Sequence, residues 1–348
     1  MGGVAYDERT GAAARYAGAE PLSRSAFAAM TASGRVSLVV ALPRFALLVA
    51  QSSALERATI ELSHFANGEL AARLRTPVEG RDCFLLGTAA PPAVQLAQLL
   101  LASDTLMRHG AARVHALLPY LAYARQDRAQ SGRSLGAAWL GRLLAACCVS
   151  DVTTIDIHSE LARTLIGLPV RSLSPAPLLA AAISEPRTDA VVVAPDRGAI
   201  ERARAMADAL ELDAPVTWID KVRKPRGVVH RRVVGELAPR AIVVDDILDT
   251  GDTLVSCAQQ LRAQRVERLE IAVTHGLFTG DRWRALTRLG VDAIHVTDSV
   301  PDARRYASRI VRIQSILPLI EMAVVEPQAG MPSASALTAP AAGRTPGG

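Results

Sequence analysis

Lysine is nearly absent from this chain: of its 39 basic residues, only Lys221 and Lys224 are lysines. Aromatic residues make up 4% of the sequence, and no dense basic patch carries interleaved aromatics. A platform for stacking the bases of a nucleic acid is therefore disfavoured. The net charge of +5 at pH 7 is modest for 348 residues and suits small polyanionic ligands.

Long apolar runs are also missing. The longest near the start, Val36–Ala50, is broken by Pro43 and Arg44, so it predicts a buried strand and not a membrane span. The sequence does not begin with a charged segment followed by an apolar stretch and a small-residue cleavage site, so we expect no secretory signal. The four cysteines lack C-x-x-C spacing and are predicted to be small core residues in a reducing compartment: Cys83, Cys147, Cys148 and Cys257. We therefore expect a cytoplasmic protein that does not bind membranes.

Short apolar runs alternate with helical patterns through most of the chain. Strands are expected at Phe45–Ala50, Cys83–Gly87, Val114–Leu118, Val152–Ile157, Ala190–Ala194, Val216–Ile219, Ala241–Val244, Leu269–Val273 and Ala293–Val296. Helices are expected at Ala93–Arg108, Leu135–Cys147, Ala199–Leu210, Thr253–Arg265 and Asp281–Leu289. The alternation predicts an α/β fold with parallel sheets covered by helices on both faces.

The length and the repeated pattern predict two similar α/β domains, at 36–170 and 171–324. Residues 1–35 are rich in Ala, Gly and Ser and predict a loosely ordered extension. Residues 325–348 have a Pro-, Ala-, Gly- and Ser-rich composition typical of a disordered tail.

The basic stretch Asp220–Gly235 interrupts this pattern and predicts a β-hairpin, with Pro225-Arg226-Gly227 as its turn. Both lysines of the chain lie on it. In a sequence that otherwise uses arginine, a retained lysine indicates a need for a compact, mobile ammonium group. Chance survival on an exposed hairpin is the alternative.

The stretch Val243–Thr253 combines acids with a helix start. Four buried aliphatic residues are expected to end a strand at Val244, and Asp245 and Asp246 follow directly. Ligands of open α/β sheets bind beyond the carboxyl ends of strands, and the amides that open a helix form an anion site. Acids beside such amides suit a sugar phosphate, which offers hydroxyls as well as phosphate. A merely N-capped helix with solvated acids would explain Asp249 and Thr250, but not the two adjacent acids after a buried strand.

The run Ala241–Thr253 resembles the 13-residue signature of type I phosphoribosyltransferases and ribose-phosphate pyrophosphokinases. The resemblance implies phosphoribosyltransferase-like domains. It also implies that ribose 5-phosphate is bound by the following residues: Asp245, Asp246, Asp249, Thr250, Gly251, Asp252 and Thr253.

Further motifs resemble the pyrophosphokinase family, and they follow one another in the family's order from about Phe45 to Pro318. Leu118–Arg128 is similar to its ATP motif, which ordinary phosphoribosyltransferases lack, and His64–Glu69 to its adenine-side segment, which in the family comes from a neighbouring subunit. The resemblance implies a homo-oligomer that binds ATP through Phe65, Asn67, Glu69, Arg125, Gln126 and Asp127.

Two more resemblances concern the reacting groups. Ile219–Arg223 matches the family's catalytic hairpin and assigns catalysis to Lys221 and Arg223. Thr154–His158 and Ala194–Ala203 resemble segments that place His158 and Asp196 near Mg²⁺. The implied activity is Mg²⁺-dependent transfer of the β,γ-diphosphoryl group of ATP to the anomeric hydroxyl of ribose 5-phosphate, giving phosphoribosyl diphosphate and AMP. The charge that develops in such a transfer explains the need for cations.

The chain departs from the family pattern at several positions. Asn67 replaces a usual aspartate, Val222 a usual arginine, and Asp252 a glycine that many pyrophosphokinases have; Ala129–Ala138 lacks the family's Arg-Glu-Pro-Ile run. Two alternatives therefore stay open, a phosphoribosyltransferase that consumes phosphoribosyl diphosphate and a non-catalytic regulatory homologue. The doubled α/β pattern argues against the first, and retention of Lys221 and Arg223 against the second.

Overall fold

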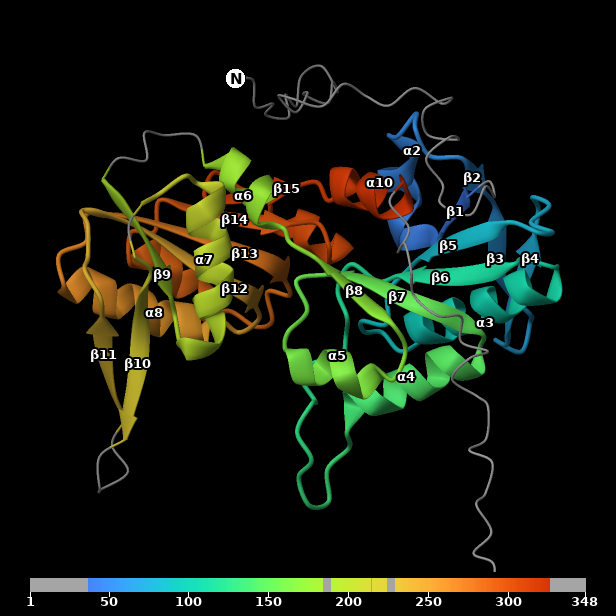
Figure 1. The fold of residues 1–348 in the computed structure, drawn as a ribbon, viewed down its shortest axis with the longest axis horizontal. Coiled ribbons are helices and arrows are strands. Elements are labelled where there is room, and N and C mark those ends of the chain that lie inside the picture. Colours follow the sequence, from blue (N-terminus) through green and yellow to red (C-terminus); the bar gives the residue numbers. More distant parts are fainter. Residues whose placement is uncertain (1–36, 184–188, 214, 224–228, 326–348) are drawn as a thin grey trace, which may run out of the picture. The chain divides into compact units, whose positions relative to one another are not determined.

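The computed structural model describes residues 37–183, 189–213, 215–223 and 229–325 (Figure 1). They form two compact units. The N-terminal unit contains residues 37–154, 159–171 and 321–325, and the C-terminal unit contains residues 155–158 and the described residues between 172 and 320. The predicted domain limits stay a prediction. The predicted extension and tail, like the turn Pro225–Gly227, lie outside the described residues, except that Val325 ends a helix.

The N-terminal unit is built on a six-stranded sheet of order β2-β1-β5-β6-β7-β8, in which β2 to β7 pair in parallel. Its strands are β1 (Ser37–Ala41), β2 (Arg57–Ala58), β5 (Asp82–Leu86), β6 (Arg113–Leu117), β7 (Val149–Ile155) and β8 (Val170–Leu173). A separate antiparallel hairpin joins β3 (Ile60–His64) and β4 (Leu70–Leu74). The helices are η1 (Pro43–Phe45), α2 (Ala46–Ala50), α3 (Val94–Arg108), α4 (Gly136–Ala146) and α5 (Glu160–Ile166). The unit also contains the last part of α10 (Leu317–Val325), from Glu321 onward.

The C-terminal unit has a seven-stranded sheet of order β11-β10-β9-β12-β13-β14-β15, and only the β10–β11 pair is antiparallel. Its strands are β9 (Ala190–Ala194), β10 (Thr217–Arg223), β11 (Val229–Val234), β12 (Arg240–Leu248), β13 (Arg268–Gly276), β14 (Ala293–Thr297) and β15 (Val311–Gln314). The helices are α6 (Ala176–Ala182), η2 (Arg197–Ala199), α7 (Ile200–Ala209), α8 (Asp252–Ala263), η3 (Arg282–Arg284), α9 (Ala285–Arg288) and η4 (Pro301–Tyr306).

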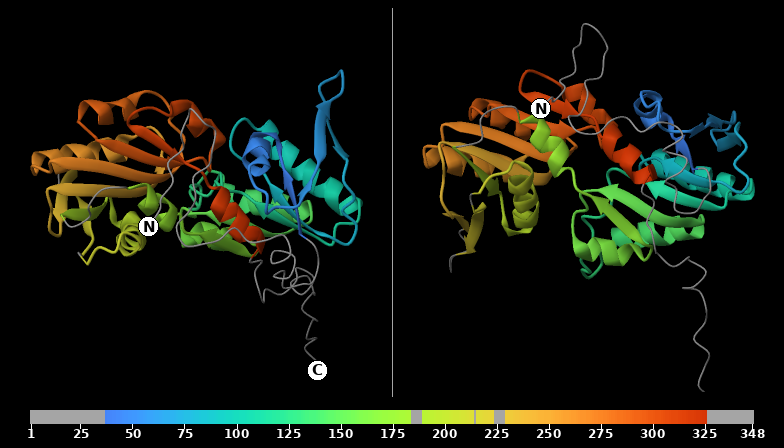
Figure 2. Two further views of the ribbon diagram at one scale, coloured as in Figure 1. Left: turned by 90° about the horizontal axis from the view of Figure 1, so that it is seen from above. Right: turned by 45° about the horizontal axis from the view of Figure 1, so that its top comes forward.

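Helices cover both faces of this seven-stranded sheet (Figures 1 and 2). Successive residues of a strand face opposite sides of the sheet, so one strand contributes side chains to the hydrophobic cores on both faces. In β12, Val243 packs in a cluster with α8, whereas Ile242 and Val244 pack in another with α6 and α7. The predicted α/β class with parallel sheets is confirmed, and the continuous aliphatic runs of the strands are explained by burial on both sides.

Two predictions about strands are wrong. Phe45–Ala50 is helical, and the first strand is Ser37–Ala41, because the chain turns at Pro43, which begins η1. The second error concerns β12, which does not end at Val244 but continues to Leu248, since its neighbour β13 offers partners as far as Gly276. The other predicted strands and the predicted helices coincide with observed elements within a few residues, with Asp281–Leu289 divided into η3 and α9. The predicted hairpin is also present.

Two of the four cysteines occupy the core, as predicted. Cys83 and Cys257 are buried, but Cys147 is only half-buried and Cys148 is exposed, because α4 ends there and the chain turns toward β7. All four are free thiols. In the described part of the chain, no helix is both long and apolar enough to cross a membrane.

Candidate active site

The predicted sugar-phosphate stretch Val243–Thr253 spans the carboxyl end of β12 and the turn that leads into α8. Gly251 has a φ of +89° and caps α8, a conformation that side chains disfavour. A Cβ at Gly251 would also lie 2.7 Å from Cα of Trp283, so the loop needs glycine for space as well. The predicted residues Asp249–Thr253 therefore form a tight turn that opens α8, and the first amides of a helix are the groups that anion sites commonly use.

His158 and Asp246, predicted separately for metal and for sugar, form one pair. Nδ1 of His158 lies 2.6 Å from Oδ2 of Asp246. Burial alone would raise the pKa of Asp246, but the hydrogen bond with His158 and the charge of Arg202 outweigh it and bring that pKa to about 2. Asp246 is therefore a carboxylate throughout the physiological range.

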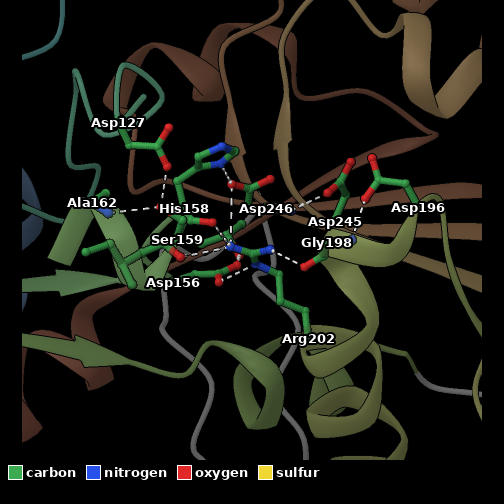
Figure 3. Close-up of polar contacts among 12 residues, drawn as sticks. Asp127, Asp156, His158, Ser159, Ala162, Asp196, Gly198, Arg202, Asp245 and Asp246 are labelled. Carbon is green, nitrogen blue, oxygen red and sulfur yellow. Dashed lines mark hydrogen bonds and ion pairs between the residues drawn. The ribbon is translucent and has the colours of Figure 1, made fainter. Parts of the chain in front are cut away.

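Arg202 on α7 organises the surrounding backbone (Figure 3). Its Nε donates to Oδ1 of Asp156 at 2.6 Å, and its Nη2 donates to the carbonyls of Ile157 and His158 at 2.8 and 3.1 Å. The same Nη2 lies 3.6 Å from Oδ2 of Asp246. One guanidinium thus fixes the backbone that carries His158 and compensates the carboxylates of buried Asp246 and partly buried Asp156.

Asp245 and Asp196 are the remaining acids of this cluster (Figure 3). Burial, followed by the like charges of Asp246 and Asp196, raises the pKa of Asp245 well above its ordinary value. Asp196 follows β9 and accepts a hydrogen bond from the amide of Gly198 at 2.9 Å. Two carboxylates that repel each other at the ends of adjacent strands β9 and β12 suit a hard divalent cation.

The described residues contain no group of three or more His, Cys, Asp or Glu side chains placed to hold a metal ion by themselves. Mg²⁺ commonly uses one or two protein carboxylates and takes its other ligands from water and substrate phosphates. The oxygen donors of Asp196 and Asp245 fit this pattern. His158 fits as well, because its Nδ1 is engaged with Asp246 and Nε2 is left as the ligand atom, the usual arrangement of a metal-binding histidine.

The predicted catalytic residues lie on the hairpin at the edge of the seven-stranded sheet. Lys221 and Arg223 belong to β10, opposite Arg231 and Val229 of β11. β10 pairs with β9 only through Thr217 and Trp218, so the lysine-bearing part of the hairpin extends past its sheet partner. This placement leaves the two cationic residues on a two-stranded ribbon, as predicted.

Three predicted nucleotide-binding residues lie at the turn between β3 and β4 in the N-terminal unit. The Phe65 side chain is 62% exposed, although an aromatic side chain is usually packed. Asn67 accepts a hydrogen bond from the amide of Glu69 at 3.1 Å, and the Phe65 amide donates to the Glu69 carbonyl at 2.9 Å. Asn67 therefore shapes the turn through its amide oxygen, a role that the usual aspartate would also fill.

The other three predicted nucleotide-binding residues lie in the loop between β6 and α4. Arg125 and Gln126 are exposed. Oε1 of Gln126 accepts from Ser134 at 3.0 Å, and Oδ2 of Asp127 accepts from Ser159 at 2.6 Å. The six predicted nucleotide residues thus lie in the N-terminal unit, and the sugar, metal and catalytic residues in the C-terminal unit.

The roles of Arg202, Asp156 and Thr274 were missed from sequence. Thr274 donates to Oδ2 of Asp156 at 2.6 Å, and Asp156 in turn binds Arg202. One feature of the sequence could have indicated a role for Asp156. The apolar residues Ile155 and Ile157, which are buried, alternate with Asp156 and His158, as in a strand with one polar face. Nothing in the sequence indicated that Arg202, in a helix 46 residues farther along the chain, would be the partner.

Comparison with known proteins covers both units. A family described as the N-terminal domain of ribose phosphate pyrophosphokinase matches residues 37–147, and the phosphoribosyl transferase domain family matches residues 176–286. The ribose-phosphate pyrophosphokinase of Caldanaerobacter subterraneus subsp. tengcongensis is 31% identical over 296 residues, which cover 83% of this chain and 93% of the relative. That of Mycoplasma pneumoniae is 35% identical over 269 residues, covering 74% and 81%.

A solved structure agrees with these sequence matches. The crystal structure of phosphoribosylpyrophosphate synthetase from Mycobacterium smegmatis superposes with a TM-score of 0.74 at 30% identity, covering 83% of this chain and 98% of that one. The likeness therefore extends through both α/β halves.

Proposed function

Because the chain belongs to the ribose-phosphate pyrophosphokinase family, we propose that it transfers the β,γ-diphosphoryl group of ATP to the anomeric hydroxyl of ribose 5-phosphate. The products are phosphoribosyl diphosphate and AMP. The observation that carries the proposal is the end of β12, where two buried or half-buried acids precede a glycine turn and the first amides of α8.

The sugar phosphate binds in two parts. The amides at the start of α8 and the hydroxyls of Thr250 and Thr253 hold the 5-phosphate, while Asp245 and Asp246 accept hydrogen bonds from the ribose hydroxyls. Binding energy from the phosphate thus orients a hydroxyl several bonds away. Asp246 serves as an acceptor because it remains ionised at neutral pH.

Asp196 and Asp245 are the residues that would hold Mg²⁺, with His158 beside them. The ion would neutralise charge on the polyphosphate when bound. Independently of the ion, Lys221 and Arg223 stabilise the negative charge that develops around the β-phosphorus as the anomeric oxygen attacks and AMP leaves.

The nucleotide contacts are assigned to the N-terminal unit. Arg125 and Gln126 contact the phosphates and ribose, Phe65 stacks on adenine, and Glu69 accepts from the polar edge of the base. The exposure of Phe65 at a hairpin turn is consistent with a residue that packs only when ligand or a second subunit is present. We therefore also propose that the active form is a cytoplasmic homo-oligomer.

The experiment is a coupled assay of purified protein with ATP, Mg²⁺ and ribose 5-phosphate that follows AMP and the diphosphorylated sugar. We expect sugar-dependent AMP release that falls by about 10³-fold or more in Lys221→Ala, with the KM of ribose 5-phosphate changed little. Lys224→Ala, which removes the other lysine, is the matched control.

Two results would contradict the proposal. Equal turnover of Lys221→Ala and the unchanged protein would remove the hairpin from the mechanism. Binding of ribose 5-phosphate without AMP release under any metal condition would indicate the non-catalytic homologue instead.

A further inference from the structure

Asp252 brings a negative charge to the loop Asp249–Thr253, which is proposed to bind the 5-phosphate. It is the first residue of α8, and its side chain is 62% exposed. Its Oδ2 accepts a hydrogen bond from the hydroxyl of Thr250 at 2.9 Å. A carboxylate in this place favours the helix N-terminus electrostatically but opposes a phosphate dianion bound there.

Arg282 compensates this charge. Its Nε forms an ion pair with Oδ1 of Asp252. Both side chains are about three-fifths exposed, so the pair adds little to stability. Because the pair lies beside the proposed phosphate site, we expect it to affect phosphate binding more than stability.

The segment that carries Arg282 is fixed to the loop by backbone and packing. The amides of Leu277 and Phe278 donate to the carbonyl of Leu248 at 2.8 and 3.1 Å, and that of Thr279 donates to Asp249 at 3.1 Å. The next residue after Arg282 is Trp283, which is 5% exposed and contacts the ring of Phe278 at a centroid distance of 4.9 Å. The backbone of Trp283 lies so close to Gly251 that a Cβ there would be 2.7 Å from Cα of Trp283. Arg282 is therefore held next to Asp252 by the buried Trp283 that follows it and by the backbone hydrogen bonds of residues 277–279.

We propose that Arg282 is a positioning residue for the sugar phosphate, which neutralises Asp252 so that the loop can accept the 5-phosphate. This inference rests on the proposed function. When the phosphate binds, the hydroxyl of Thr250 turns from Asp252 to a phosphate oxygen, and Arg282 remains as the partner of Asp252. Without Arg282, the uncompensated carboxylate repels the dianion.

The test is a double-mutant cycle read as KM for each substrate. Arg282→Gln should raise the KM of ribose 5-phosphate about five- to tenfold, the size expected for one carboxylate that has lost its ion-pair partner, while the KM of ATP stays within about twofold. In an Asp252→Asn background, the same substitution should change the KM of ribose 5-phosphate by less than about twofold. The effect should shrink as ionic strength rises, because both charges are exposed.

Two controls separate this role from a structural one. Arg288→Gln removes the same charge from an exposed position on α9 and should leave the KM of ribose 5-phosphate within about twofold. Arg282→Lys, which keeps the charge, should recover most of the affinity lost in Arg282→Gln.

The outcomes are distinguishable. An equal KM increase in both backgrounds would overturn the inference, since Arg282 would then act independently of Asp252; so would an unchanged KM in Arg282→Gln. Absence of sugar-dependent AMP release from the unchanged protein would instead refute the proposed function.

Discussion

Arg197 and Asp220 form a two-point ion pair between the segment after β9 and the β10–β11 hairpin, which carries Lys221 and Arg223. Nε of Arg197 lies 3.0 Å from Oδ1 of Asp220, and Nη2 lies 2.8 Å from Oδ2. Asp220 directly precedes Lys221, and the strand beyond Trp218 has no partner on β9. The pair therefore connects the hairpin to the loop of Asp196 at the point where the sheet no longer does.

Loss of this connection should affect turnover more than binding. We expect Arg197→Met to lower kcat about tenfold and to leave both KM values within about twofold, because a less constrained ribbon places the cations less often in register with the β-phosphorus. Steady-state kinetics for both substrates measure this split. Arg204→Met, an exposed arginine paired with Glu201 on α7, is the control, and equal kcat values for all three proteins would show the pair to be incidental.

Arg202 should be far more important to stability than Arg204, which lies two residues farther along α7. Its side chain is 17% exposed and compensates Asp156 and Asp246, so Arg202→Met should reduce the free energy of unfolding by about 3–5 kcal/mol. The exposed Arg204→Met should change it by less than about 1 kcal/mol. Urea titrations of the variants test this difference, and a similar midpoint for both would contradict the account of the buried network.

A second buried network predicts a pH dependence of stability. Burial would raise the pKa of Glu270, but hydrogen bonds from His295, at 3.0 Å, and Arg240 outweigh it and lower that pKa to about 2. Because this value lies below the ordinary 4.5, the stabilisation is complete above pH 4.5 and is lost as pH falls toward 2.

The measurement is the free energy of unfolding between pH 6 and pH 3. The native protein should lose about 2 kcal/mol more than Glu270→Gln over this interval. The exposed Glu267→Gln should keep the native profile. Parallel curves for Glu270→Gln and the native protein would mean that this carboxylate does not titrate as described.

The turn Asp249–Thr253 should not tolerate a side chain at Gly251. In Gly251→Ala, the new Cβ meets Cα of Trp283 at 2.7 Å and the residue keeps a φ of +89°, so the loop must move. We expect the KM of ribose 5-phosphate to rise at least about tenfold. Gly280→Ala imposes a positive φ but no contact within 4 Å, and it should raise this KM much less. Similar effects of the two substitutions would attribute the defect to backbone strain alone.

Local pattern was sufficient to predict most elements and the order of the motifs. Continuous aliphatic runs such as Ala190–Ala194 indicated strands buried on both faces, although the apolar run Phe45–Ala50 is helical. The Thr-Gly turn indicated the start of α8. The length of β12 could not be predicted, because Asp245 and Asp246 disfavour a strand locally and are held there by the pairing with β13. Likewise, Arg202 meets Asp156 only through tertiary structure, so neither residue revealed its partner.

The alternation of exposure along the end of β12 has a consequence for engineering the protein. Burial alternates from half-buried Asp245 to buried Asp246, half-buried Ile247 and buried Leu248. Neighbouring positions in such a strand cannot exchange sides, so one amino acid inserted before Asp245 would turn Asp246 away from His158 and put its neighbour there. Redesign of this segment must therefore add or delete residues in twos, whatever their chemical character.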